Sequence, residues 1–503
     1  MKKEIIENGL FVIGIILYNI FFWEEQMGLN TLLFTLFVIG SLFYLNPESR
    51  YSTIARLTAL GTLFTALMVV IFNSQFSKVV HILSLMTMIG FVHQRELRFL
   101  WYGLLLALIN LFSTPIKLIK KVKAIQFGKG KSLKKVGRFI KLGILPMFFV
   151  GLFFIFYAVA NRNFARRSSD FLYEIGLFFN GWDFGFNEQR IFFFICSVFI
   201  IGGLFWKVQP EWLVRLQSNH KDDIIRNRKR YKSNGFFKPS PIGLKNEYRS
   251  GLIMLVALNL LTLTVNVTDV QTTWIGFSTI NPYDISHDVR FGAYVLIFTI
   301  LMAIAVLLFF FRNNLNFYSK NKALKIAALV WIIQNMVLAF SVALRNIKYV
   351  NHYSLTYKRI GVFIFLALVL YGLGTVIFKI NEKKTAYYLF KNNAWSLYIA
   401  LILLTSVNWD TMITKYNLGL EKTATPDYRY LVVDLSDKNL PIIYNNIDLF
   451  ENVFYYRYSY DLQTAINTKE YKFKRRKENQ SWLSWNYADH NTLLYLNQHQ
   501  LAD

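Results

Sequence analysis

The feature that most constrains this chain is a series of apolar runs, each about as long as a bilayer is thick. The clearest pair covers residues 323–344 and 360–378, and each run has about 20 residues. A helix rising 1.5 Å per residue needs about that length to cross a hydrocarbon core of about 30 Å. The sequence therefore predicts two membrane-spanning helices joined by a short polar turn.

The same apolar character recurs along the chain, in which 54% of the 503 residues are hydrophobic. A soluble domain of this size cannot hide so much apolar surface, so we expect an integral membrane protein. The candidate spans are residues 9–23, 31–45, 55–72, 78–92, 97–114, 142–160, 190–206, 250–267, 290–311, 323–344, 360–379 and 394–408. The predicted fold is all-α, a polytopic transmembrane helical bundle of about 12 spans with a small C-terminal extracytoplasmic domain.

Two connecting segments carry most of the formal charge of +26 and predict the orientation. Residues 117–141 contain ten Lys or Arg and no acid, and residues 207–249 contain eleven against four acids. Basic loops between spans are retained in the cytoplasm. We therefore expect both loops inside, in contact with anionic lipid headgroups, and the tail outside. The position of this charge between spans does not favour a nucleic-acid partner.

These features predict four segments. Residues 1–116 form N-terminal transmembrane helices, and residues 117–141 form a basic cytoplasmic loop. Residues 142–409 form a core transmembrane bundle that includes the basic loop 207–249. Residues 410–503 lack a long apolar run and are rich in Tyr and Asn, which predicts an extracytoplasmic tail domain.

Polar residues at the ends of the later spans form the candidate site, because a polar group in a membrane is costly and needs a reason. With the predicted topology most of them converge at the outer face. The residues are Asp269, His287, Arg290, Gln334, Asn335, Arg345, Tyr349, Thr356, Arg359 and Asp410. Arg345 needs a counter-charge near hydrocarbon, for which Asp269 and Asp410 are both candidates.

Two interpretations of this cluster are open. It could be an outward-facing pocket that binds an anionic or polar group through Arg345, Arg359 and His287. It could instead be a structural clamp, in which ion pairs fix how the spans and the tail dock.

No catalytic motif is present, and neither a metal site nor a cofactor is expected, since the single cysteine, Cys196, lies within an apolar run. His81 and His93, at the two ends of one span, are interpreted as residues of the membrane interface.

Several motifs resemble those of a family of bacterial multi-pass membrane proteins known only as a domain of unknown function. The pattern Arg345-x3-Tyr349 followed by Leu355-Thr356-x2-Arg359 is similar to that family's R-x3-Y and L-T-x-x-R signature. Other matching pieces lie at residues 158–164, 286–294, 408–417 and 482–486. Ser354 stands where the family has Gly, and Arg162 where it tends to have Pro.

The resemblance implies a multi-pass protein of the bacterial inner (cytoplasmic) membrane and supplies no activity. Three hypotheses follow. The first is a non-enzymatic envelope scaffold or sensor that binds a protein partner at its outer face through the tail. The second is a transporter or lipid flippase with an outward-facing polar pocket. The third is a membrane-embedded transferase that uses His287 or Asp410 as base.

Overall fold

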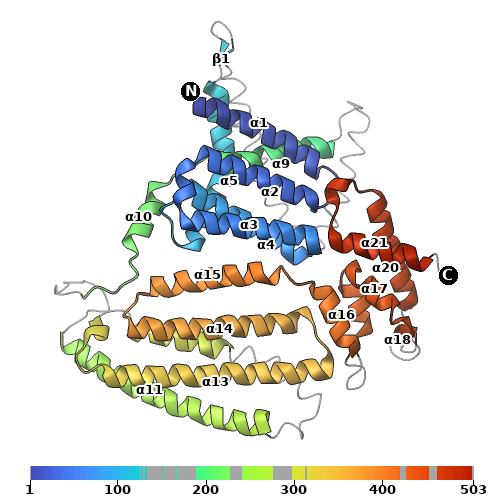
Figure 1. The fold of residues 1–503 in the computed structure, drawn as a ribbon. Helices are drawn as coiled ribbons and strands as arrows, with labels where there is room; N and C mark the ends of the chain where they lie inside the picture. Colours follow the sequence, from blue (N-terminus) through green and yellow to red (C-terminus); the bar gives the residue numbers. More distant parts are fainter. Residues whose placement is uncertain are drawn as a thin grey trace. The chain divides into compact units, whose positions relative to one another are not determined.

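The computed structural model describes residues 2–124, 126–127, 131–132, 150, 167, 188–226, 241–275, 297–311, 314–419, 426–451 and 462–500. The chain forms two compact units (Figure 1). Unit 1 comprises Met1–Val214 and Gln480–Asn486, and unit 2 comprises Arg215–Asn479 and Tyr487–Asp503. Helix α10 (Glu211–Asn219) carries the chain from the first unit into the second.

Unit 1 is a helical bundle in which each long helix packs on its neighbours in a ring. Helix α1 contacts α2 and α9, and the contacts then pass from α2 through α3, α4 and α5 back to α9. The elements are α1 (Lys2–Phe22), α2 (Leu29–Leu45), η1 (Pro47–Tyr51), α3 (Thr53–Phe72), α4 (Gln75–His93), α5 (Leu100–Ala124), β1 (Gln126–Phe127), β2 (Lys131–Ser132) and α9 (Glu188–Phe205). The two short strands pair with each other.

Small residues allow the closest helix contact in unit 1. A Cβ added to Gly90 of α4 would lie 2.0 Å from the carbonyl oxygen of Gly103 in α5. Backbones approach this closely only where side chains are absent, which is the usual way in which helices associate in lipid.

His81 and His93 are buried in unit 1, so their interpretation as residues of the membrane interface was wrong. They are 3% and 1% exposed. The His81 ring lies 3.3 Å from the hydroxyl of Thr35 and 3.2 Å from that of Thr65. His93 Nδ1 lies 2.9 Å from the amide nitrogen of Asn110. Hydroxyls on two neighbouring helices contact both nitrogens of His81, whereas Nε2 of His93 has no hydrogen-bond partner among the described residues. The sequence pattern alone does not show such partners.

The segment Gln480–Asn486 completes unit 1 at the turn between α1 and α2. Leu29 N donates to Trp485 O at 3.0 Å, and the Ser484 hydroxyl donates to the carboxylate of Glu25. A Cβ on Gly28 would lie 2.6 Å from Ser484 O, so only glycine fits beside this backbone. The short helix η8 (Trp482–Ser484) lies in this segment.

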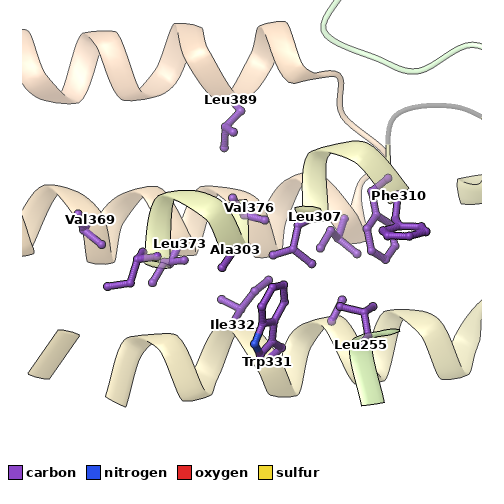
Figure 2. Close-up of a cluster of buried hydrophobic side chains, with 14 of the residues drawn as sticks. Leu255, Ala303, Leu307, Phe310, Trp331, Ile332, Val369, Leu373, Val376 and Leu389 are labelled. Carbon is purple, nitrogen blue, oxygen red and sulfur yellow. The ribbon is translucent and has the colours of Figure 1, made fainter. Parts of the chain in front are cut away.

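Unit 2 contains long membrane helices and a set of short helices. The first group is α11 (Pro241–Asp269), the π-helix η3 (Val270–Ile275), a helix over Ile297–Phe310, η5 (Asn314–Phe317), α13 (Lys322–Tyr353), α14 (Tyr357–Asn381) and α15 (Ala386–Leu404). Helix α13 lies between α11 and α14, and α14 packs on α15. Figure 2 shows part of the apolar core, where Trp331 and Ile332 of α13 face Ala303 and Leu307.

Lys379 lies fully buried beside this core although no acid of the described ranges is paired with it. Its ammonium donates to Phe311 O at 2.8 Å, and the side chain is 1% exposed. That carbonyl ends the helix Ile297–Phe310, where a cation complements the helix dipole. A lysine stem that crosses apolar surface with its head on a helix end is stable in such a position.

The second group of elements in unit 2 forms what we call the C-terminal lobe. It comprises α16 (Trp409–Gly419), the π-helix η6 (Tyr430–Asp434), η7 (Asp437–Asn439), α17 (Leu440–Tyr444), α18 (Ile447–Glu451), α20 (Leu462–Glu478) and α21 (Tyr487–Gln500). Its buried residues, among them Ile413, Leu431 and Phe473, form one cluster with Val350 and Leu355 at the turn between α13 and α14. The lobe and this turn therefore share a core.

The all-α, polytopic transmembrane bundle predicted from the sequence is confirmed. Seven helices in the described part of the chain are long and apolar enough to cross a membrane, or eight if α15 and α16, bent by 71°, count as one span. Three shorter apolar helices, Leu29–Leu45, Gln189–Phe205 and Ile297–Phe310, lie where spans were predicted. The predicted span 142–160 lies outside the described residues except for Val150. The count of about 12 and the four segment boundaries stay predictions.

Candidate functional site

Helices α11 and α13 pack in parallel along a row of polar contacts, which we call the seam. Each contact joins residues about 68 positions apart, as expected of two helices that run in the same direction in register. The hydrogen bonds are Asn259 Nδ2 to Ala327 O (2.9 Å), Trp331 Nε1 to Thr262 Oγ1 (2.9 Å), Asn266 Nδ2 to Gln334 O (3.2 Å) and Trp274 Nε1 to Ser341 Oγ (2.7 Å).

The residues of α11 in the seam follow a helical repeat. Asn259, Thr262, Asn266 and Asp269 are spaced by three, four and three positions, so they lie on one face of the helix. Polar side chains on such a face hold helices together where lipid gives no hydrophobic driving force.

A buried ion pair closes the seam at the C-terminal end of α13. The Arg345 guanidinium donates to Asp269 Oδ1, and Arg345 Nε donates to Thr273 Oγ1 at 3.1 Å. The Thr273 hydroxyl in turn donates to Asp269 Oδ1 at 3.4 Å, and Lys348 Nζ donates to Thr273 O. The Asp269 side chain is 6% exposed and that of Arg345 is 23% exposed. Of the two acids that the sequence offered to Arg345, the structure pairs it with Asp269.

Arg359 and Tyr349 meet at the turn between α13 and α14. The guanidinium carbon lies 4.3 Å from the centre of the Tyr349 ring, a cation–π distance, and Nη1 donates to Tyr353 O. Asn346 Nδ2 donates to Arg359 O at 3.0 Å. These contacts fold the end of α13 onto the start of α14, which Thr356 precedes as its N-cap residue.

Asp410 joins the C-terminal lobe to the same turn. Its hydrogen bonds are separate from those around Arg345. It is 5% exposed, and its two carboxylate oxygens accept from two hydroxyls. Tyr357 Oη donates to Oδ1 at 2.8 Å, and Ser436 Oγ donates to Oδ2 at 2.5 Å. Two turns further along α16, Asn417 Oδ1 accepts from Leu355 N at 2.6 Å and Asn417 Nδ2 donates to Leu355 O at 2.9 Å.

The ten residues singled out from the sequence thus fall into separate groups. Asp269, Arg345 and Gln334 lie in the seam; Tyr349, Thr356 and Arg359 lie at the turn, which Asp410 contacts through Tyr357. Asn335 donates to Trp331 O within its own helix at 2.8 Å. His287 and Arg290 lie outside the described residues. The described members are engaged in contacts within the chain.

Sequence reasoning missed Lys469, the most unusual charged residue of the lobe. Its ammonium donates to Val432 O and Leu435 O at 3.0 Å, to Leu431 O at 3.5 Å and to Asn439 Oδ1 at 2.9 Å. Burial lowers the pKa of Lys469 to about 8. Its ligands are mostly main-chain carbonyls of η6 and the following turn, which carry no signal in the sequence.

Five basic residues follow Lys469 on α20: Lys472, Lys474, Arg475, Arg476 and Lys477. Three of the five are paired inside the lobe: Lys474 with Glu470 (2.6 Å), Arg476 with Asp437 (2.8 Å) and Lys477 with Asp489 (2.6 Å). Lys472 and Arg475 are exposed. Most of this charge therefore stabilises the lobe.

The region of the chain that a protein-family model matches contains the contacts of the seam and the turn described above. The model of the family described as domain of unknown function DUF4153 matches residues 57–446, which include the seam, the turn and Asp410. The chain belongs to the DUF4153 family. This confirms the resemblance noted in the sequence. No curated protein and no solved structure matches the chain.

Ser354 stands at the position where the resemblance led us to expect Gly. It ends α13 with φ 73° and ψ 163°, a backbone conformation that is nearly restricted to glycine. The residue is 1% exposed, and its hydroxyl has no hydrogen-bond partner in the described structure. In this member of the DUF4153 family, Ser354 therefore holds the turn in its conformation at a cost in stability.

We expect the substitution Ser354→Gly to stabilise the protein, because it removes both the strained backbone and the buried hydroxyl. The expected gain is about 1–2 kcal/mol in the free energy of unfolding. Thermal unfolding of the purified protein in detergent measures it. The matched control is Ser406→Gly, since Ser406 is exposed and donates to Leu403 O. An unfolding temperature of Ser354→Gly below that of wild type would show that the backbone at Ser354 is not strained.

Proposed function

We propose that the protein is a non-enzymatic scaffold or sensor of the bacterial inner membrane, and that its C-terminal lobe lies outside the cytoplasm and binds an envelope protein. The observation that carries this proposal is the engagement of the polar site by the chain itself. Arg345 is bound by Asp269 and Thr273, and Asp410 by Tyr357 and Ser436. Groups engaged in this way hold parts of a protein in place.

The construction of the lobe supports a role in transmitting a signal. The lobe shares its core with Val350, Leu355 and Ile360 at the turn of the hairpin formed by the membrane helices α13 and α14. Asp410 and Asn417 add polar contacts to that turn. A partner that binds the lobe would therefore act directly on the ends of two membrane helices.

The proposed orientation follows from the basic loops 117–141 and 207–249, which we place in the cytoplasm against anionic headgroups. It can be tested with a Cys196→Ser protein that carries one new cysteine. A cysteine at Tyr471, 63% exposed on α20, should react with a membrane-impermeant maleimide in intact cells. One at the exposed Lys221 should react only after lysis. The reverse pattern would overturn the orientation.

Partner binding can be tested with a photoreactive amino acid in native membranes. Placed at Tyr471 or at the exposed Val433 of the lobe, it should give one discrete protein adduct. Placed at Ile253, 71% exposed on the membrane helix α11, it should give no such adduct. The Asp410→Ala variant should weaken the lobe adduct several-fold because the lobe is no longer held. Lobe positions that give no adduct in correctly inserted protein would overturn the proposal.

The alternative, a transporter or lipid flippase, requires an open polar path that includes Arg345. The ion pair with Asp269 weighs against this use of the guanidinium. Flux across reconstituted vesicles that is lost in Arg345→Ala would favour the transporter over the scaffold.

A further inference from the structure

Four buried oxygen atoms in the seam have no hydrogen-bond partner among the described residues. Asn259 Oδ1 lies further along the seam, and the other three are Asn266 Oδ1, Asp269 Oδ2 and Gln334 Oε1. Asn266 is 7% exposed and Asp269 is 5% exposed. A buried oxygen without a donor costs on the order of 1–3 kcal/mol, so three of them in one place need an explanation.

The three side chains lie together. Asn266 and Asp269 are three positions apart on α11, on the same face and separated by a rise of about 4.5 Å. Asn266 Nδ2 donates to the main-chain oxygen of Gln334, so α13 brings Gln334 to the same level of the seam. Two amide oxygens and one carboxylate oxygen are therefore carried by neighbouring positions of the seam.

The hydrogen-bond partner of the Asn266 amide determines which of its two ends is the nitrogen. Its nitrogen faces the carbonyl oxygen of Gln334, and a flip of the amide would bring two acceptors together. The same argument applies two turns away along the seam at Asn259, whose nitrogen donates to Leu255 O and Ala327 O. Its oxygen is also buried without a partner in the described part of the chain.

A group of acceptors without donors matches a cation better than it matches water. A water molecule can donate only two hydrogens and adds an oxygen that itself accepts hydrogen bonds. A small hard cation takes several oxygen ligands at once, and amide, carbonyl and carboxylate oxygens are its usual ligands. Arg345 already balances the charge of Asp269, so the remaining site favours a single positive charge over a double one.

We propose that the seam binds a monovalent cation of the sodium class through Asn266, Asp269 and Gln334. The ion supplies the positive partner that these oxygens lack, and it joins α11 to α13 beside the ion pair. This site goes beyond the scaffold or sensor role proposed above: that role uses the contacts that Arg345 and Asp410 already make, and the cation would use the oxygens that those contacts leave over.

The test uses the full-length protein in detergent. Sodium chloride is compared with choline chloride at equal ionic strength, and both the midpoint of thermal unfolding and the binding of radioactive sodium are measured. At a sodium concentration about tenfold above the dissociation constant, mass action raises the midpoint by about 1–3 °C. The rise should saturate as sodium is increased.

Variants assign the effect to the seam. Asn266→Ala and Gln334→Leu should each lose the sodium-dependent rise and the bound radioactive sodium. The matched control is Asn393→Ala in α15, because the Asn393 amide likewise joins two helix positions, donating to Thr375 Oγ1 at 3.0 Å and Leu389 O at 2.9 Å. This control should keep both responses.

Two results would overturn the proposal. The first is a wild-type protein that unfolds at the same temperature in sodium and in choline and binds no radioactive sodium, which is the outcome if water alone fills the seam. The second is sodium stabilisation that survives in both seam variants. Because the first comparison uses wild-type protein, it remains decisive even if a variant fails to fold.

Discussion

Replacing Asp269 by Leu is expected to destabilise unit 2 by about 3–5 kcal/mol, because it leaves the Arg345 guanidinium among membrane helices without its counter-charge. Arg345→Met should cost a similar amount by leaving the Asp269 carboxylate unpaired. Thr273, which accepts from Arg345 Nε, cannot replace a full charge. Unfolding in detergent at a fixed sodium concentration measures both losses.

The double variant Asp269→Leu with Arg345→Met distinguishes the ion pair from the shape of the site. Since a buried pair gains little over apolar residues of similar volume, the double variant should recover most of the stability. The coupling energy of the cycle should be about 3 kcal/mol or more. Strictly additive losses would show that the two side chains do not act on each other.

Replacing Lys469 by Met is expected to cost about 2–4 kcal/mol at neutral pH. The substitution removes the donor to Val432 O, Leu435 O and Asn439 Oδ1 and leaves these oxygens buried. Lys472→Met, on the exposed face of the same helix, is the matched control and should change the stability by less than about 0.5 kcal/mol. Chemical denaturation monitored by tryptophan fluorescence measures both.

The pH dependence gives Lys469 a signature of its own. Its pKa is about 8 in the folded protein, against 10.5 for an ordinary lysine. Between these values the unfolded chain binds more protons than the folded one, so stability rises with pH. Below pH 8 the full cost of burying the charge is present. The stability of wild type relative to Lys469→Met should therefore increase by about 2–3 kcal/mol from pH 8 to pH 10.

Above about pH 10, tyrosines of the lobe add a pH dependence of their own to the stability. Burial, together with the hydrogen bond to Glu470, raises the pKa of Tyr444 above its ordinary value of 10.0. The folded protein then keeps a proton that the unfolded chain loses, so stability falls again above about pH 10. A difference between wild type and Lys469→Met that stays constant from pH 8 to pH 10 would contradict the assignment to Lys469.

Much of the fold could be read from the sequence because lipid imposes simple demands. Residues 323–344 and 360–378 had to be helices, since only helices satisfy the backbone of a single apolar segment in a membrane. The need of Arg345 for a counter-charge limited its partner to a few acids, and Asp269 is the one observed. A buried charge needs an opposite charge close to it, so few residues could serve as the partner of Arg345.

The rest depends on contacts that leave no pattern in the chain. From the sequence, Asp269 and Asp410 were both candidates for the counter-charge of Arg345. In the structure Asp410 instead accepts from the hydroxyls of Tyr357 and Ser436. Lys469 is held largely by carbonyls, which every residue has. The short helices of the lobe have no long apolar run, so their packing onto the turn at Leu355 could not be predicted from periodicity.

The placement of Gln480–Asn486 has a consequence for biogenesis. These seven residues belong to unit 1, whereas the residues on both sides of them belong to unit 2. During synthesis the turn at Gly28 waits for its backbone partners Ser484 and Trp485, which lie more than 450 positions further along the chain. The bundle that is begun first is thus completed only after most of unit 2 has been made, and a nascent chain cut short before this segment would leave it incomplete.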